Sequence, residues 1–369
     1  MPALDQYFDV LLDRDGSDLH LSVGYPPTIR VKGELVAIER GPLDRPTITR
    51  LMDELLNQER RDYFHAYHDL DFAYGYQDKA RFRANYLYKT TGPGAVFRTI
   101  PSEILTTEQL GLPEAVVGLA DRRAGLVLVT GPTGSGKSTT LAAMLDYINR
   151  TREGHILTIE DPVEFVHRPR KCQITHREVG VHTPSFADAI RSAGRENADV
   201  ILVGELRGRE TMKMALQLAS FGVLIFATVH TNSAPATIDR FVNAFPASQQ
   251  PQIRGMLAES LAGIIAQQLL KKADGSGRVA AQEILIGTSG VSSAIREAKT
   301  SMLQSLIQSG GSYGMQSIDA VLAKLVAEGK VTAQDAIEKA ADKDGFAKIP
   351  AVAEALQVQQ RQGECPQLY

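Results

Sequence analysis

The chain has 369 residues, of which 43% are hydrophobic and 22% charged, and its formal net charge is −3. This length allows two domains with separate cores, and the composition is that of a globular protein. The small negative charge argues against bulk binding to nucleic acid, so we expect no nucleic-acid partner. No apolar run approaches about 18 residues, and no signal peptide is predicted. The two cysteines, Cys172 and Cys365, match no metal-ligand spacing and indicate a reducing compartment.

The first hundred residues mix predicted helices with strands of alternating polar and apolar residues, which is typical of an α+β domain. The expected elements are a helix over residues 4–12, a strand over 17–23, a hairpin over 28–35 that turns at Lys32 and Gly33, one helix from 45 to about 65, and strands over 69–76, 80–88 and 94–100. A linker is expected over residues 101–112.

Three arginines lie on these predicted strands: Arg81, Arg83 and Arg98. Arg81 and Arg83 are two residues apart, so their side chains share one face of a strand. Most surface arginines are only solvated. Three of them on predicted strands of one domain favour a phosphate contact, which is a γ-phosphate contact if this domain is joined to a nucleotide site, because a guanidinium group binds phosphate in a bidentate manner.

The most specific motif follows the linker. An apolar run over residues 125–130 predicts a strand, the sequence GPTGSGKST occupies residues 131–139, and a helical pattern begins at Thr140. A strand, a phosphate-loop motif and a helix in this order predict a nucleotide site in which glycines let backbone N–H groups turn toward phosphate. The predicted nucleotide-binding residues are Pro132, Thr133, Gly134, Ser135, Gly136, Lys137, Ser138 and Thr139.

The expected cofactors are therefore ATP and Mg²⁺. Lys137 would reach the β- and γ-phosphate oxygens, Ser138 would hold Mg²⁺ through its hydroxyl, and Thr139 would lie on the α-phosphate side.

Strands alternating with helices continue after the loop, which is typical of a parallel sheet with crossover helices. Expected strands over residues 155–159, 199–205 and 223–228 lead to Glu160, Glu205 and His230. Glu160 would polarise an attacking water, although an acid at a strand end can also cap a helix. Glu205 closes an apolar run as the Walker B acid does, and would hold Mg²⁺ or its water. His230 would sense the γ-phosphate, or is a satisfied turn histidine.

The remainder is expected to be largely helical. The predicted elements are a helix over residues 251–270, a hairpin turning at 274–277, a strand over 279–286, several helices over 290–340 and one helix over 351–362.

Together these motifs resemble the secretion-superfamily ATPases of the GspE/VirB11 type, and within them the PilT/PilU group of type IV pilus retraction motors. The resemblance covers most of the chain. It is carried by SDLHLSVGYPPTIRVKGEL from Ser17, RFRANYLYKTTGPGAVFRTIP from Arg81, the phosphate loop, and GMQSIDAVLAKLVAEGKVT from Gly314. Three motifs are similar to the family's Asp box, Walker B and His box, namely ILTIEDPVEF at 156–165, ADVILVGELR at 198–207 and LIFATVHTNSA at 224–234.

The resemblance implies Glu160 as the catalytic glutamate, Glu205 as the Walker B acid and His230 as the His-box histidine. It implies that the three arginines named above reach the nucleotide phosphates. The implied fold is α/β: a PAS-like α+β domain over residues 1–100, a RecA-like P-loop motor domain with a parallel-type central sheet over 113–290, a helical region over 291–348 and a tail over 349–369.

By the same resemblance the protein is expected to be a homo-hexameric ATPase that powers pilus retraction and twitching motility. It would be cytoplasmic and bound peripherally to the inner membrane through a PilC-like platform protein, with a second motor of the PilT or PilB type as a further partner.

The chain departs from the family pattern in three places. Residues 220–223 read Ser-Phe-Gly-Val instead of Glu-Thr-Gly-His, residues 195–199 lack an acid and a proline, and the AIRNLIRE signature survives only at residues 294–297. These departures fit an alternative, an auxiliary or regulatory PilU-like ring subunit with low intrinsic activity. A third alternative is a pilus-assembly or type II secretion ATPase, against which the lack of a Cys₄ zinc motif argues.

Overall fold

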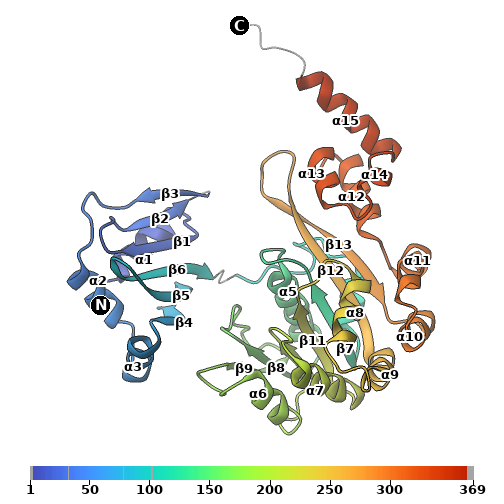
Figure 1. The fold of residues 1–369 in the computed structure, drawn as a ribbon, viewed down its shortest axis with the longest axis horizontal. Coiled ribbons are helices and arrows are strands. Elements are labelled where there is room, and N and C mark those ends of the chain that lie inside the picture. The colour runs from blue at the N-terminus through green and yellow to red at the C-terminus, as the bar shows by residue number, and fades with distance from the viewer. Residues whose placement is uncertain (1–2, 32, 78, 101–102, 364–369) are drawn as a thin grey trace. The chain divides into compact units, whose positions relative to one another are not determined.

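A computed structural model describes residues 3–31, 33–77, 79–100 and 103–363 (Figure 1). Lys32 of the expected hairpin turn, the first two residues of the expected linker and Cys365 lie outside the described residues. The chain forms two compact units. One comprises Met1–Ile104 with Pro162–Val166, and the other comprises Leu105–Asp161 with His167–Tyr369.

The first unit is a six-stranded sheet with helices, and its strand order is β3-β2-β1-β6-β5-β4, with every pair antiparallel. Its elements are α1 (Asp5–Asp13), β1 (Asp18–Ser22), β2 (Thr28–Val31), β3 (Glu34–Ala37), α2 (Arg45–Asp53), α3 (Gln58–Tyr67), β4 (Asp69–Tyr76), β5 (Ala80–Lys89) and β6 (Gly92–Ile100). Aromatic side chains fill its core, where the rings of Phe8 and Phe82 stack at 4.3 Å. The unit therefore mixes helices with antiparallel strands, as expected.

The single helix expected from residue 45 to about residue 65 is wrong. Two helices occupy this stretch, because Asn57 starts a new one. The backbone of Asn57 is extended, and its side chain accepts a hydrogen bond from the N–H of Arg60 at 2.9 Å. An asparagine that caps an N-terminus in this way replaces a helical backbone bond, so the helix phase restarts at Gln58.

The second unit contains a seven-stranded sheet with strand order β13-β12-β7-β11-β10-β8-β9. Its strands are β7 (Gly125–Thr130), β8 (Gly154–Glu160), β9 (Cys172–Glu178), β10 (Val200–Val203), β11 (Leu224–Val229), β12 (Leu261–Lys271) and β13 (Arg278–Ile286). All neighbouring pairs are parallel except β12 and β13. The parallel-type sheet is confirmed, while β9 was not anticipated and the strand expected over 199–205 is shorter.

Helices between the strands cover this sheet. They are α4 (Glu114–Ala120), α5 (Lys137–Thr151), α6 (Phe186–Ala193), α7 (Arg209–Ser220), α8 (Ala234–Asn243) and α9 (Gln250–Ser260). Helix α5 packs on β7, β8 and β9, and α8 packs on β12 and β13. The central strands β7, β10 and β11 are buried along their whole length, as expected for parallel strands whose two faces are covered by helices.

The helix expected over 251–270 is wrong in its second half. Helix α9 ends at Ser260, and the chain continues directly as strand β12, which pairs in parallel with β7 and antiparallel with β13. The run Leu-Ala-Gly-Ile-Ile at 261–265 is fully buried. A continuous apolar run of this kind fits a buried strand as well as a buried helix, so its periodicity could not distinguish them.

Strands β12 and β13 form a long hairpin that reaches from the central sheet toward the C-terminal helices (Figure 1). Leu270 and Ala281 of this hairpin belong to the apolar core of those helices, whereas Ile264 and Ile284 belong to the sheet core. The C-terminal elements are α10 (Ser289–Arg296), η1 (Thr300–Met302), α11 (Leu303–Ser309), η2 (Gly311–Tyr313), α12 (Ile318–Ala327), α13 (Ala333–Lys339), α14 (Lys343–Phe346) and α15 (Pro350–Gly363). Within the described ranges, no helix has both the length and the apolar character to cross a membrane.

Candidate active site

Four neighbouring strands of the second unit, in the order β7-β11-β10-β8, end at the same edge of the sheet. The phosphate loop follows β7, His230 follows β11, Glu205 lies two residues beyond β10, and Glu160 is the last residue of β8. Because the strands are parallel, their carboxyl ends form one crevice, which is where sheets of this type bind ligands. The parallel topology thus brings the predicted loop, both acids and the histidine to one edge.

The phosphate loop has the backbone that a phosphate cradle requires. Gly131, Gly134 and Gly136 have φ angles of 146°, 78° and 84°, which disfavour residues with a Cβ atom. A Cβ at Gly131 would collide with the carbonyl oxygen of Gln267 on β12. Gly136 is the N-cap residue of α5, and within the described part of the chain no side chain caps this N-terminus. An uncapped helix start behind a glycine loop fits a bound phosphate group.

Lys137 lies at the mouth of the loop and is only 9% exposed. Its ammonium Nζ donates to the carbonyl oxygens of Gly131 at 2.9 Å and Pro132 at 3.0 Å, so the lysine is held across the loop. The loop residues Pro132, Thr133 and Gly134 are exposed. Ser138 and Thr139 lie half-buried in the first turn of α5.

Glu205 is bound by two partners at the strand edge. Its Oε2 lies 2.7 Å from the guanidinium of Arg207, and its Oε1 lies 3.3 Å from Nε2 of His230. Burial by itself raises the pKa of Glu205, but the hydrogen bond and charge of Arg207, with a smaller effect of His230, outweigh burial and lower that pKa. Glu205 therefore stays ionised near neutral pH and connects the segment after β10 to His230, which follows β11.

Glu160 is 8% exposed at the end of β8. Gly204 packs directly on it, since a Cβ at Gly204 would lie 3.4 Å from Cγ of Glu160. Gly204 immediately precedes Glu205, so Glu160 and Glu205 lie at the carboxyl ends of the neighbouring strands β8 and β10. The carbonyl of Glu160 accepts from the N–H of Val179 at 2.9 Å, which fixes the strand end.

The three predicted arginines lie on β5 and β6 of the first unit. Arg83 is directly opposite Arg98 in the register of these strands, and Arg81 lies two residues before Arg83 on the same face. The Arg98 side chain is 70% exposed and its Nε lies 2.8 Å from Oδ1 of the buried Asp18. The registers place these arginines together, and their contact with phosphate stays a prediction.

A hollow of about 430 Å³ opens beside Glu205 and His230. Its lining includes Arg207, Arg240 and Asn243 in addition to these two residues. Sequence reasoning did not single out Arg207, although its position two residues after the Walker B acid was a usable signal. The hollow therefore has a mixed wall beside His230, in which Arg207 and Arg240 supply positive charge and Met212 and Val229 supply apolar surface.

Sequence reasoning also missed the buried amides Gln267 on β12, which contacts Ser135 of the phosphate loop, and Gln282 on β13, which donates to Gln267. For Gln267 the available signal was a glutamine inside an apolar run, but that run had been predicted as helix; Gln282 lies in a segment that was predicted as a strand. Glu283, 2% exposed, was missed as well; its Oε1 accepts from the N–H of Ala234 at 2.8 Å, at the start of α8.

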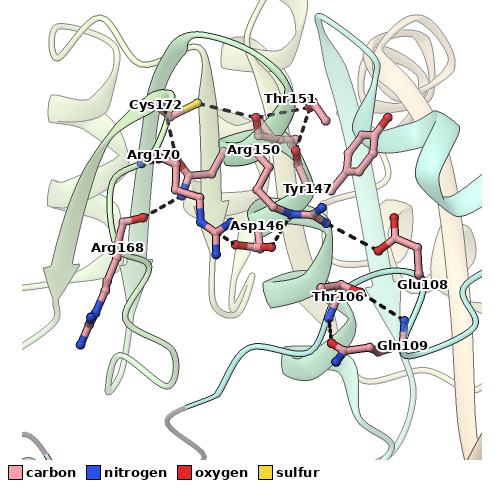
Figure 2. Close-up of polar contacts among 12 residues, drawn as sticks. Thr106, Glu108, Gln109, Asp146, Tyr147, Arg150, Thr151, Arg168, Arg170 and Cys172 are labelled. Carbon is pink, nitrogen blue, oxygen red and sulfur yellow. Dashed lines mark hydrogen bonds and ion pairs between the residues drawn. The ribbon is translucent and has the colours of Figure 1, made fainter.

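The far end of α5 is anchored by a polar cluster (Figure 2). Arg150 lies between Asp146 at 2.8 Å and Glu108 at 3.7 Å, and Arg170 approaches Asp146 from the other side at 3.9 Å. The buried Asn149 donates to the carbonyl of Arg168 and accepts from the N–H groups of Arg170 and Cys172. These contacts fix α5, and hence the loop at its N-terminus, to the segment that leads into β9.

The sequence profile described as "Type II/IV secretion system protein" matches residues 34–357. The chain belongs to this family. It is 51% identical over 330 residues to the type IV pilus retraction ATPase PilT of Pseudomonas aeruginosa, covering 89% of this chain and 96% of PilT. It is 39% identical to the type IV pilus ATPase PilU of the same organism, over 90% of this chain and 87% of PilU.

Among solved structures, this type II/IV secretion system protein is similar to the pilus retraction motor PilT with bound ADP. The TM-score is 0.88 at 41% identity, covering 94% of this chain and 99% of that chain. The α/β ATPase fold of the family is thereby confirmed for this chain.

Proposed function

We propose that this family member is an ATP-hydrolysing ring motor that drives retraction of type IV pili. The observation that carries the proposal is the phosphate loop, whose left-handed glycines, uncapped helix start and pinned Lys137 stand beside two acids at the same sheet edge. Support comes from the near full-length similarity to the retraction ATPase PilT and to its ADP-bound structure.

In this proposal the residues act mainly by position and charge. Loop N–H groups and Lys137 would bind the phosphates, and Ser138 and Glu205 would hold Mg²⁺, which prefers hard oxygen ligands. When bound, Mg²⁺ supplies neutralisation of the phosphate charge. Glu160 would orient the attacking water and accept its proton. Arg81, Arg83 and Arg98 would stabilise charge that develops on the transferred phosphoryl group.

His230 would couple the site to the rest of the second unit. It contacts Glu205 on one side, and three residues further along the chain Ser233 caps α8. A shift of Glu205 in response to the phosphates would therefore be passed to α8. This is a conformational route from nucleotide state to the surface of the subunit.

We further infer the domain roles and the partners. The first unit would be the PAS-like domain and the second would contain the RecA-like motor domain and the helical region, with the bounds 1–100, 113–290, 291–348 and 349–369 as predicted. Six copies would form the ring. The ring would act at the cytoplasmic side of the inner membrane on a PilC-like platform protein, with a second PilT- or PilB-type motor as a further partner.

The test is steady-state ATP hydrolysis by the purified full chain with Mg²⁺. We expect Lys137→Ala and Glu160→Gln each to lower turnover at least about a hundredfold, since each removes a group that acts on the reacting phosphate. Lys343→Ala, at an exposed lysine of α14, is the matched control and should be neutral. Unchanged turnover in both site variants would refute the proposal.

A second candidate is an auxiliary PilU-like subunit. It is favoured by the turn after α7, where residues 220–223 read Ser-Phe-Gly-Val and Val223 stands in place of the family's histidine. Turnover of the chain alone, followed by turnover after mixing with a partner motor, separates the two. A motor hydrolyses ATP alone, whereas an auxiliary subunit is active only in the mixture.

A further inference from the structure

Two buried glutamines on the β12–β13 hairpin have no place in the motifs that define the site. Gln267 is 2% exposed and Gln282 is 3% exposed, and the two face each other in the register of the hairpin. A buried amide is costly unless its donor and acceptor atoms are satisfied, so the partners of these side chains show what the amides do.

The amide of Gln267 joins three elements. Its Nε2 donates to the carbonyl oxygen of Ser135 in the phosphate loop at 2.6 Å. Its Oε1 accepts from Oγ1 of Thr140 in the first turn of α5 at 2.8 Å and from Nε2 of Gln282 at 2.7 Å. The orientation of the Gln267 amide is determined by Ser135, because the carbonyl oxygen of Ser135 can only accept a hydrogen bond and must therefore face the amide nitrogen.

The bond to Ser135 sets the direction of a peptide unit. The Ser135–Gly136 peptide is planar, and in a trans peptide the C=O and the N–H point in opposite directions. With its carbonyl held by Gln267 on the β12 side, this peptide turns the N–H of Gly136 away from β12, toward the open side of the loop. The loop also lies against β12 here, since a Cβ at Gly136 would come within 2.9 Å of Nε2 of Gln267.

We propose that Gln267 is a positioning residue for phosphate binding: it holds the Ser135–Gly136 peptide so that the Gly136 N–H can donate to the diphosphate part of the nucleotide. The inference rests on the proposed nucleotide-binding function. Gln282 has a supporting role, because its donor to Oε1 keeps the Gln267 amide in the required orientation. The backbone carbonyl oxygen of Gln282 in turn accepts a hydrogen bond from Nε2 of Gln316 at 2.8 Å.

The proposal makes the phosphate loop dependent on a hairpin that also belongs to the C-terminal core. Leu270, three residues beyond Gln267, and Ala281, adjacent to Gln282, pack with α12 and α13. The β12–β13 hairpin therefore contacts the phosphate loop through Gln267 and packs against the C-terminal helices through its other end.

The test uses the full chain carrying Gln267→Leu, which keeps the size of the side chain but cannot donate. Gln268→Leu is the matched control, since Gln268 is the next residue of β12, points to the other face and reaches only the carbonyl of Lys339 at 3.4 Å. The readouts are the dissociation constant for ADP by calorimetry, the protection of residues 131–139 from hydrogen exchange by ADP, and the kcat and KM for ATP.

We expect Gln267→Leu to bind ADP about tenfold more weakly, the loss of one well-placed hydrogen bond. ADP-induced protection of the loop should fall in parallel. KM for ATP should rise about tenfold with kcat within about twofold, because the same N–H serves bound substrate and transition state alike. Gln282→Leu should show a smaller weakening of about threefold, and Gln268→Leu none.

A folded Gln267→Leu variant that binds ADP as the wild type does, with unchanged loop protection, would overturn the inference and leave the proposed function standing. If Gln267→Leu does not fold, Gln267→Met replaces it, because its unbranched side chain of similar length cannot donate to Ser135 either; wild-type ADP binding in that variant would likewise overturn the inference. If the wild type and Gln268→Leu themselves bind no ADP, the proposed function is wrong and the inference fails with it.

Discussion

His167 provides a quantitative test of the structure through the pH dependence of stability. The residue is 4% exposed, and its buried Nδ1 has no hydrogen-bond partner among the residues that the structure describes. Burial, followed by the charge of the neighbouring His176, lowers the pKa of His167 from 6.5 to about 4. His176 accepts the backbone N–H of His167 at its Nε2, at 3.1 Å. The folded protein thus keeps this imidazole neutral at mildly acidic pH.

The sign of the effect follows from proton binding. Between pH 6.5 and about 4 the unfolded chain binds a proton at His167 and the folded chain does not. The free energy of unfolding must therefore fall as the pH is lowered through this window. The shift corresponds to a loss of about 2 kcal/mol between pH 7.5 and 5, and about 3 kcal/mol once both states are protonated.

The assay is urea unfolding of the wild type and of His167→Phe at several pH values from 7.5 to 5. The difference between the two isolates His167, because all other titrating groups are common to both proteins. We expect the variant to gain about 2 kcal/mol relative to the wild type over this range. His65→Phe, at an exposed histidine, is the matched control and should show no such trend. A pH-independent difference for His167→Phe would refute the reasoning.

Three further predictions concern the loop, its anchor and the Walker B acid. Gly136→Ala should weaken ADP binding more than tenfold, because φ is 84° and the new Cβ would meet Nε2 of the buried Gln267. Gly134→Ala should weaken it less, because φ is similar at 78° but the space around the new Cβ is open. Equal affinities of the two variants in calorimetry would contradict this. Asn149→Ala removes the partner of three backbone groups and should lower the free energy of unfolding, measured in urea, by about 3 kcal/mol. A loss below about 1 kcal/mol would show that the Asn149 contacts do not anchor α5. Arg207→Ala removes the main group that lowers the pKa of Glu205, so the acid limb of the ATPase pH profile should move to higher pH, and an unmoved limb would show that Glu205 does not control it.

Several features were predictable because their physical basis is local. The phosphate loop requires glycines at fixed spacing between a strand and a helix, so its residues and context could be read directly, and β7 has the expected bounds. The acids Glu160 and Glu205 were expected at strand ends because a parallel sheet collects carboxyl ends at one edge. The structure places them there.

Other features depend on packing between distant segments. Whether 261–271 is helix or strand was decided by the open edge of β7, with which this segment pairs, and not by its own apolar pattern. In the same way, Asn57 divides a helical stretch through one side-chain bond, which composition does not reveal.

The sequence by itself therefore determined the fold class, the nucleotide motif and the order of the site segments, because each rests on residues close together in the chain. Only the tertiary structure decided that Arg207 and His230 share Glu205, and that Gln267, itself bound by Gln282, contacts Ser135 of the phosphate loop 132 residues away. The physical reason is that a buried polar group must find its partner in space, and the partner's identity depends on which strands the sheet makes neighbours.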